Sequence, residues 1–384
     1  MITLIDGAEV YAPEPLGVQP VLLLDGKIAK VGSLDQRALL QLGLEVSVID
    51  ARGCMVVPGF IDPHEHLLGG SGERGFASQT PELALSEIAS AGITTVVGCL
   101  GVDTTTKTMT GLLAKARAFR EEGISAFIYS GGYDVPPVTL TGSLRLDMLL
   151  VPEVIGSGEV AISDLRSTCP SDHELARLAS EAYVGGILTG KAGVMHVHVG
   201  DGRTGLAPLC RLLDEHEISP ATIYPTHVER NERLMREAVA LTRRGVVVDV
   251  DTVECDLAKW VRFYLEEGGD LSMLTASSDA SIPSPATLSE QLRGLVREGI
   301  LPLERALSLV TTNTARVLKL TRKGALRADH DADLVVLNRE LEVVHVVAGG
   351  RQLVRDGRFA ITERFLEQSN RVVELRGLRA SRQP

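Results

Sequence analysis

Residues 58–66 read PGFIDPHEH and follow the apolar residues MVV at 55–57. The stretch predicts a buried strand that ends in a polar His-x-His pattern. Residues i and i+2 of an extended segment point the same way, so His64 and His66 can offer two imidazoles to one metal ion. One such pair is weak evidence alone, since a surface coincidence produces it about as often. The rest of the chain has to decide between these two interpretations.

This stretch is the first of eight apolar runs that alternate with helical patterns, which predicts βα units around a parallel sheet. Eight strands across about 225 residues predict a (β/α)8 TIM barrel, for which about 250 residues are typical. An open doubly wound sheet is the structural alternative. One helix is marked by the capping-box pair Ser171 and Glu174, followed by apolar residues at helical spacing, namely Leu175, Leu178, Ala179, Ala182 and Tyr183. The runs are 55–61, 93–100, 126–130, 153–159, 194–199, 222–225, 246–250 and 274–278.

Both ends of the chain have a different sequence pattern, in which short predicted strands are separated by Asp-Gly and Gly-Gly turn dipeptides. Chain termini often lie close together, so the two segments can form one small domain. We therefore expect residues 1–56 and 325–384 to form a small β-sandwich, and residues 57–324 to form the catalytic barrel.

Composition excludes several classes of protein. The chain is 44% hydrophobic and 23% charged, which is typical of a globular protein, and its net charge of −11 disfavours a nucleic-acid partner. No apolar run reaches the length of a membrane span, and residues 1–7 do not resemble a signal peptide, so we expect no membrane partner and a cytoplasmic location. The five scattered cysteines are expected to be small buried residues rather than a disulfide framework or a zinc knuckle. They are Cys54, Cys99, Cys169, Cys210 and Cys255.

Further polar residues occur where predicted strands end, on the face where barrel active sites are built. His198 ends the fifth run, His227 follows the sixth, and Asp279 follows the eighth. These strand ends would place imidazoles and a carboxylate at one end of the barrel. Such a gathering favours a metal site over a set of unrelated core histidines. His196 points inward one layer deeper, so we expect it to be a packed, hydrogen-bonded core histidine.

The motifs together resemble a known family. The segments that carry the resemblance are PGFID with His64 and His66, GGSGE at 69–73, GYDVP at 132–136 with TGS at 141–143, ISDLRS at 162–167, VGD at 199–201 and PTHVERN at 225–231. Over nearly its full length the chain resembles the isoaspartyl (β-aspartyl) dipeptidases of the amidohydrolase superfamily. This resemblance implies a metallohydrolase of β-aspartyl dipeptides.

The resemblance also implies ligands and catalytic groups. His64, His66 and Asp279 would hold one divalent cation, and His198 with His227 would hold a second, with zinc the expected metal. Two such cations make a bridging hydroxide competent near neutral pH. Asp279 would take the proton from this nucleophile and pass it to the leaving amine, and Tyr133 would donate a hydrogen bond to the developing oxyanion.

A β-aspartyl dipeptide carries one ammonium and two carboxylates, so its pocket needs roughly one anion and two cations. Glu73 can supply the anion, while Arg166 and Arg230 can each match a carboxylate with a planar fork. The resemblance adds Ser71 to the substrate-binding set, and Ser281 or Ser284 are further candidates. It also implies a homo-oligomer, with an octamer as the family's pattern.

One position departs from the family. Seven residues before Arg166, where the family has a carboxylated lysine that bridges the two metals, this chain has Glu159. Glutamate keeps the charge and the two oxygens but is about three bonds shorter. We expect Glu159 to bridge two cations, with a single-metal site as the alternative; Lys191 precedes the fifth run, at the wrong end of the barrel, and is no substitute.

Two other functions remain open at this point. One is another amidohydrolase, acting on a cyclic amide or an N-acyl amino acid, which has kept the scaffold and altered the pocket. The other is a non-catalytic scaffold in which Glu159 marks the loss of the metal site.

Overall fold

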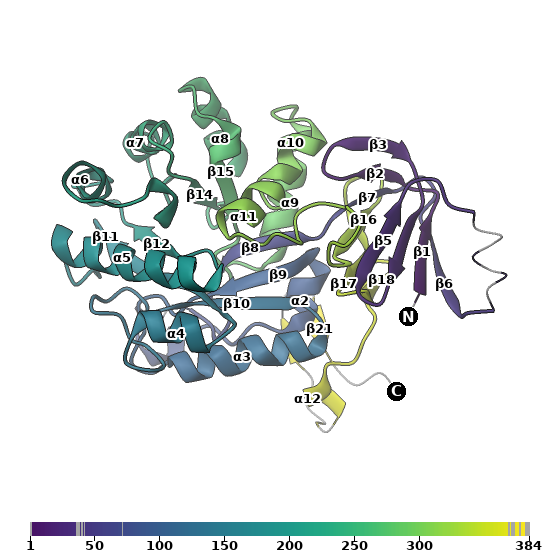
Figure 1. Cartoon of the computed structure of the whole chain (residues 1–384), viewed down its shortest axis with the longest axis horizontal. Coiled ribbons are helices and arrows are strands. Elements are labelled where there is room, and N and C mark those ends of the chain that lie inside the picture. Colours follow the sequence, from purple (N-terminus) through teal and green to yellow (C-terminus); the bar gives the residue numbers. More distant parts are fainter. Residues whose placement is uncertain are drawn as a thin grey trace.

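The computed structural model describes residues 2–35, 39, 41, 43–70, 72–367, 369, 373–375 and 378–380. Ser71, one of the predicted substrate-binding residues, lies outside this part of the chain. Figure 1 shows helices packed around a curved set of parallel strands. The strands from both chain ends lie together at the right of this view, away from helices α5 (Asp172–Thr189) and α6 (Ala207–Glu215). Within the described residues, no helix is both long enough and apolar enough to cross a bilayer.

Eight strands follow one another at the places where apolar runs predicted them. Their neighbours in the sheet are also their neighbours in the chain, and the pairings are parallel, as βα units require. The strands are β8 (Phe60–Glu65), β9 (Ile93–Gly98), β10 (Ser125–Ser130), β11 (Val154–Ile162), β12 (Val194–Val199), β13 (Ile223–Thr226), β14 (Val248–Asp251) and β15 (Leu274–Ser277).

Helices connect these strands and cover the outside of the sheet (Figure 1). Helix α5 begins with the predicted capping box of Ser171 and Glu174, and its apolar stripe is buried as predicted, except that Tyr183 is exposed. The helices are α2 (Leu85–Ser90), α3 (Met109–Glu122), α4 (Leu144–Leu150), α5 (Asp172–Thr189), α6 (Ala207–Glu215), α7 (Glu232–Thr242), α8 (Leu257–Glu266), α9 (Ala286–Arg297), α10 (Leu303–Ser308), α11 (Thr312–Val317) and α12 (Arg364–Glu367). Short 3-10 turns occur at η1 (Phe76–Ser78), η2 (Pro220–Thr222) and η3 (Leu271–Met273).

The parallel strands are not one continuous ladder. Strands β8 to β13 form a six-stranded curved sheet, and β14 and β15 form a separate pair, so the predicted eight-stranded barrel is confirmed only as a TIM-like, partly closed arrangement. Proline has no backbone N–H to donate, and Pro225 in β13 and Pro63 in β8 lie beside the two gaps. A single bridge between Glu65 and Ala280 links the two edges at the β8 side.

Buried carboxylates span both gaps. Asp249 on β14 accepts hydrogen bonds from Tyr224 and Thr226 on β13, and also from Thr275 and Ser277 on β15. At the other gap, the carboxylate of Asp62 on β8 accepts from the backbone N–H of Ser278 just after β15. Side-chain acceptors therefore connect strands that the ladder leaves apart.

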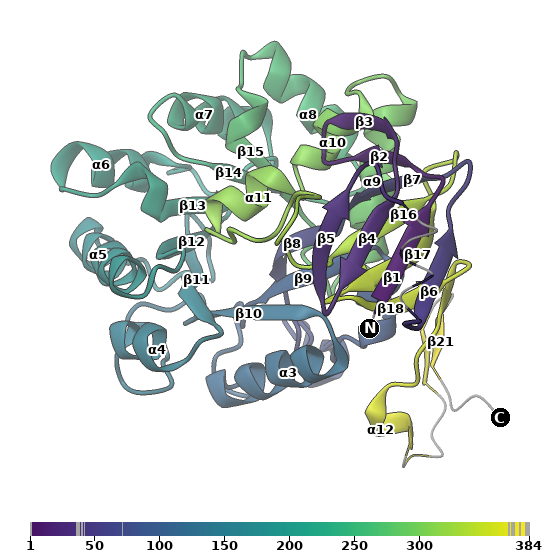
Figure 2. The same ribbon diagram turned by 45° about the vertical axis from the view of Figure 1, so that its right-hand side comes forward.

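The ends of the chain build two further sheets. One contains β5 (Lys27–Val31), β4 (Val21–Leu24), β1 (Ile2–Asp6) and β6 (Val46–Asp50). The other contains β19 (Arg358–Phe359), β18 (Arg351–Arg355), β17 (Val343–Ala348), β16 (Leu334–Leu337), β7 (Met55–Pro58), β2 (Glu9–Tyr11) and β3 (Pro15–Val18), so only this sheet combines strands from both ends. A small separate pair joins β20 (Val373–Leu375) to β21 (Leu378–Ala380). Figure 2 shows these strands on the side of the molecule away from α5 and α6.

One apolar core contains residues of both larger sheets, including Ile5 and Leu23 from the first and Val56 and Val336 from the second. The predicted run 55–61 is divided at Gly59: β7 pairs antiparallel with β16, and only β8 enters the parallel sheet. A side chain at position 59 would collide with Thr94, so glycine permits the close crossing between the sheets. The β-sandwich and the domain boundaries at 56/57 and 324/325 stay predictions.

The Asp249 network predicts a large effect on stability. Asp249→Ala would remove an acceptor that four buried hydroxyl groups share, and we expect it to lower the free energy of unfolding by about 3 kcal/mol or more. Urea unfolding of chelator-treated protein measures the change. Asp214→Ala, at an exposed ion pair with Arg244, is the matched control and should change stability by less than about 0.5 kcal/mol. Equal effects of the two substitutions would contradict the bridging role.

Candidate metal centre and active site

The predicted metal ligands come from five strands and meet at their carboxyl ends. His64 lies on β8, Glu159 on β11 and His198 on β12, whereas His66 and His227 directly follow β8 and β13, and Asp279 lies two residues after β15. Their exposed fractions lie between 0% and 8%, so they form a buried polar cluster. His227 and Asp279 have φ of 62° and 53°, a left-handed conformation that is uncommon for non-glycine residues.

Glu159 lies at the middle of this cluster. Its Oε1 is 3.5 Å from Nε2 of both His64 and His66, and its Oε2 is 3.0 Å from Nδ1 of His198 and 3.7 Å from Nε2 of His227. One carboxylate oxygen thus faces each predicted histidine pair. Glu159 lies within β11, and its buried carboxylate lies between the two histidine pairs. A glutamate side chain at this position is therefore long enough to reach both pairs.

The donor set fits divalent cations. His64 Nε2 and Asp279 Oδ1 are buried and, among the described residues, have no hydrogen-bond partner, although the two atoms are 3.3 Å apart. An unpaired buried polar atom is costly, and a cation would satisfy both. Imidazole nitrogens and carboxylate oxygens are ligands that zinc and similar metals accept. The metal and the number of ions stay predictions.

Charges inside the cluster depend on one another. Burial alone would lower the pKa of His227, but its contacts with Asp251 and Glu159 raise that pKa to about 9. Burial would raise the pKa of Asp279, but close contacts with His64 and His66 hold it well below its usual range, so Asp279 is an ionised carboxylate. The raised pKa of His227 favours a proton on this imidazole, which offsets carboxylate charge and which a bound cation would displace.

A second layer of residues orients the predicted ligands. The Nε2 of His196 forms a 2.8 Å hydrogen bond with Nδ1 of His64, and its Nδ1 lies 2.9 Å from the carbonyl oxygen of Tyr224. Its ring packs against two tyrosine rings, so it is the packed core histidine that the sequence predicted. Asp251 Oδ2 lies 2.6 Å from Nδ1 of His227. Such partners fix the ring orientation of a ligating histidine.

Sequence reasoning missed three polar residues of this region. Asp251 ends β14, and its signal was a carboxylate directly after an apolar run. Glu229 is buried beside it; burial first, and then the charge of Asp251, raise the pKa of Glu229 well above its usual range. Cys99 directly follows β9 and is 1% exposed, so it is a small buried residue as predicted, although its Sγ lies 4.0 Å from Glu159. The same prediction is wrong for Cys169 and Cys255, which are exposed.

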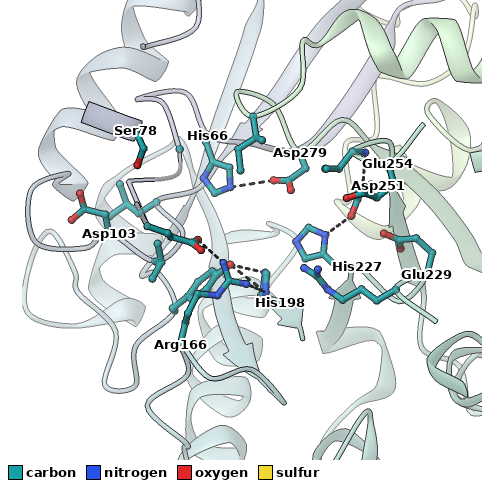
Figure 3. Close-up of a pocket in the computed structure, with 18 of the residues that line it drawn as sticks. His66, Ser78, Asp103, Arg166, His198, His227, Glu229, Asp251, Glu254 and Asp279 are labelled. Atoms are coloured by element: carbon teal, nitrogen blue, oxygen red, sulfur yellow. Dashed lines mark hydrogen bonds and ion pairs between the residues drawn. The ribbon is translucent and has the colours of Figure 1, made fainter. Parts of the chain in front are cut away.

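The cluster opens into a cavity of about 770 Å³. Figure 3 shows the side chains of His66, His198, His227 and Asp279 turned toward one shared space. Tyr133 also lines this cavity, and its hydroxyl is 2.8 Å from Nδ1 of His198. Burial first, and then the charge of Glu159, raise the pKa of Tyr133 well above its usual range, so the phenol stays a hydrogen-bond donor.

Three of the predicted substrate-binding residues line the same cavity. Arg166 forms ion pairs with Glu73 at 2.6 Å and with Asp164 at 2.7 Å. Arg230 donates from Nε to the Val199 carbonyl at 2.8 Å, and none of the described carboxylates forms an ion pair with it. Of the two predicted carboxylate-binding arginines, Arg166 is therefore internally paired and Arg230 is available.

The remaining candidates lie elsewhere. Ser281 contacts Thr80 and the backbone of Gly70, so it joins the segment after β15 to the segment after β8, and Ser284 is exposed before α9. Lys191 donates to the carbonyls of Met148 and Val151, outside the cluster, as the sequence indicated. Catalytic and binding roles for all predicted site residues stay predictions.

The central position of Glu159 predicts its effect on metal content. Glu159→Gln keeps the shape but removes the charge that faces both histidine pairs, so we expect metal to fall from two ions per chain to one or fewer. Elemental analysis after exhaustive dialysis measures this. Glu181→Gln, on the outer helix α5, is the control and should retain both ions. Unchanged metal in Glu159→Gln would show that this carboxylate does not bridge.

Comparisons with known proteins agree on the scaffold. A sequence model described as the amidohydrolase family matches residues 281–361. Among curated proteins, adenine deaminase of Halalkalibacterium halodurans is 22% identical over 329 residues, which cover 82% of this chain and 51% of the deaminase. The chain thus spans about half the length of that relative.

Solved structures give a more specific likeness. The β-aspartyl dipeptidase of Fervidobacterium islandicum AW-1 is 38% identical, with 94% of this chain and 99% of the other covered and a TM-score of 0.89. Its structure in complex with the dipeptide β-Asp-Leu is 36% identical, with 94% and 98% covered and a TM-score of 0.88. Since this identity extends over nearly the whole of both chains, the present chain is a hydrolase of the amidohydrolase superfamily and belongs to the β-aspartyl dipeptidase family.

Proposed function

We propose that this protein hydrolyses the isopeptide bond of β-aspartyl dipeptides with the help of two divalent cations, with zinc the expected metal. The observation that carries the proposal is the position of Glu159 between two histidine pairs, at the base of a cavity lined by Glu73, Arg166 and Arg230. The likeness to a β-aspartyl dipeptidase supports the same substrate class.

Cations held by His64, His66, His198 and His227 would polarise the amide carbonyl and lower the pKa of a water. Asp279 is ionised and faces His64 and His66, so it can accept the proton of the attacking water and return it to the leaving amine. Tyr133 keeps its phenolic proton and points at the same space, where it would donate to the carbonyl oxygen as charge develops.

The ion pair between Glu73 and Arg166 suits a zwitterionic substrate. An ammonium that draws Glu73 away from Arg166 frees the Nη1 of this guanidinium for a substrate carboxylate, while its Nη2 keeps Asp164 as a partner. A dipeptide that brings both charges offers a partner to Glu73 and to this Nη1, whereas a molecule with only one charge replaces only one side of the ion pair. Arg230 is available for the second carboxylate. This exchange favours β-aspartyl dipeptides over neutral cyclic amides.

Location in the cytoplasm and assembly into a homo-oligomer, with an octamer as the family's pattern, stay predictions. The described ligands and the residues that line the cavity come from one chain.

Substrate charge provides the direct test. Purified protein should hydrolyse β-Asp-Leu, lose activity after chelation and recover it with zinc. N-acetyl-β-Asp-Leu lacks the ammonium, so we expect its kcat/KM to be at least about 10-fold lower, since it offers Glu73 no cation to replace Arg166. Amine release measured for both substrates decides this. Turnover of a cyclic imide or an N-acyl amino acid, with none of β-Asp-Leu, would instead support the alternative amidohydrolase.

The role of Tyr133 is tested separately. Tyr133→Phe removes the proposed donor to the oxyanion and leaves the ring, so kcat should fall about 10²- to 10³-fold while KM changes little. Tyr183→Phe, exposed on α5, is the matched control and should behave as wild type. Steady-state kinetics with β-Asp-Leu measure both. An unchanged kcat in Tyr133→Phe would remove this residue from the mechanism.

A further inference from the structure

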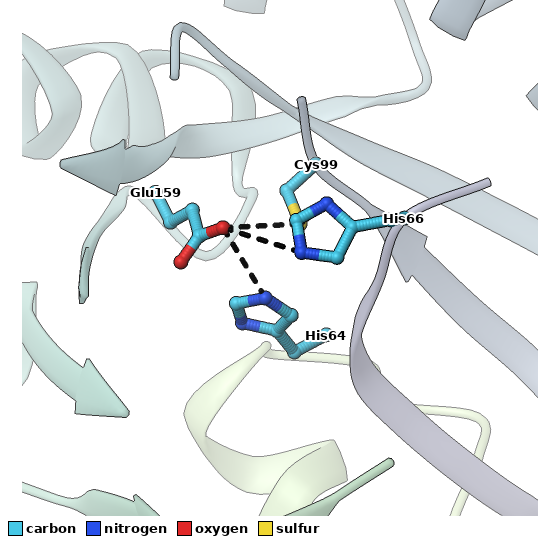
Figure 4. Close-up of side chains that lie close together, drawn as sticks. All are labelled: His64, His66, Cys99 and Glu159. Atoms are coloured by element: carbon cyan, nitrogen blue, oxygen red, sulfur yellow. Dashed lines mark hydrogen bonds and ion pairs between the residues drawn. The ribbon is translucent and has the colours of Figure 1, made fainter. Parts of the chain in front are cut away.

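Cys99 is the one thiol among the described residues that lies within the ligand cluster. It follows β9, a strand that supplies none of the ligands predicted from the sequence, and its side chain is buried. Figure 4 shows Cys99 close to the ring of His66, with the carboxylate of Glu159 facing the rings of His64 and His66. The four side chains each offer a ligand atom, and these atoms lie within 4.8 Å of one another.

The distances suit one shared ion. Two atoms bound to the same zinc can lie at most about 4.3 Å apart when one is sulfur, from bond lengths of about 2.3 Å to sulfur and 2.0 Å to oxygen or nitrogen. Cys99 Sγ is 4.0 Å from Glu159 Oε1, and that oxygen is 3.5 Å from Nε2 of each histidine. The sulfur–oxygen and oxygen–nitrogen distances lie within this limit, and all four ligand atoms lie within 4.8 Å of one another, so small side-chain adjustments would let them share one ion.

We propose that Cys99 is a thiolate ligand of the cation held by His64, His66 and Glu159. The position is that of a terminal ligand rather than a bridge, because the second group of ligand atoms contains Glu159, His198 and His227 without the thiol. On binding, the thiol loses its proton to solvent and the sulfur lone pair forms the bond to the cation. The Nε2 of His64 is buried without a hydrogen-bond partner among the described residues, which independently indicates that a cation binds here.

A sulfur ligand changes what the centre prefers. Thiolate is soft and negatively charged, so it favours zinc or cobalt over magnesium or manganese. It also adds an anion next to Glu159 and Asp279, where two cations would otherwise have few negative charges to offset them. The proposal goes beyond the dipeptidase function and depends only on the metal site, so it can succeed whichever amide the protein hydrolyses.

The structure also defines the rival role. Cys99 Sγ lies 3.7 Å from Nδ1 of His66 and 3.6 Å from the carbonyl of Glu65, so the thiol could serve only as a hydrogen-bond partner that orients His66. In that case sulfur would not touch the ion. A spectroscopic probe of the metal–sulfur bond separates the two roles without reference to activity.

Cobalt(II) is the probe. The full-length wild type, Cys99→Ser and Cys210→Ser are stripped with a chelator, and cobalt is titrated while near-ultraviolet absorption is recorded. A fourth protein carries Cys54→Ser, Cys169→Ser, Cys210→Ser and Cys255→Ser and retains only Cys99. We expect a thiolate-to-cobalt charge-transfer band in the wild type, in Cys210→Ser and in the Cys99-only protein, and its loss in Cys99→Ser.

Metal retention gives a second readout. Outer-shell partners alone change metal affinity about 10- to 100-fold, so loss of a direct ligand in Cys99→Ser should weaken zinc retention against a competing chelator by at least that factor. Cys210→Ser, partly buried on α6, should retain zinc as the wild type does.

Each outcome decides the proposal. Identical cobalt spectra of wild type and Cys99→Ser, or no band in the Cys99-only protein, would overturn it and leave Cys99 as a partner of His66. If Cys99→Ser does not fold, the Cys99-only protein alone decides. A wild type that binds no cobalt would overturn the metal centre itself, whereas a band without hydrolysis of β-Asp-Leu would support Cys99 as a ligand and contradict only the dipeptidase function.

Discussion

A single buried carboxylate, that of Glu159, holds the site in its arrangement. Its two oxygens face two pairs of histidines, and it is fully buried with them. A carboxylate in such a place is strongly disfavoured unless positive charge surrounds it, and protonated imidazoles or bound cations are the available sources. Charged neighbours within the same cluster also hold the pKa of Asp279 well below its usual range and raise the pKa of His227 to about 9.

The strands supply the geometry that this balance requires. Side chains alternate along an extended strand, so His196 and His198 on β12 both point inward, one against the core tyrosines and the other into the ligand cluster. Where the hydrogen-bond ladder is interrupted, Asp249 and Asp62 accept hydrogen bonds across the gaps and keep the strand ends together. The buried hydrogen bonds that connect the strands therefore also keep the predicted ligands together at the carboxyl ends of the strands.

The cavity above the ligands adds selectivity through charge. Glu73 and Arg166 neutralise each other in the present state, and Arg230 lies beside them without an acidic partner among the described side chains. Such an arrangement matches a small molecule that carries charges of both signs. Under the proposed function, this arrangement favours a charged dipeptide over a neutral ring.

The sequence by itself determined the succession of strands, the positions of the predicted ligands at their ends, and the family, because periodicity and local motifs depend on neighbouring residues. Only the tertiary structure decided that run 55–61 divides at Gly59 between two sheets, and that the parallel strands close only in part. It also decided that Glu159 is long enough to reach both histidine pairs, and it brought Cys99, Asp251 and Glu229 to the site. These contacts join residues far apart in the chain, so their distances depend on how whole strands pack, which no local pattern records.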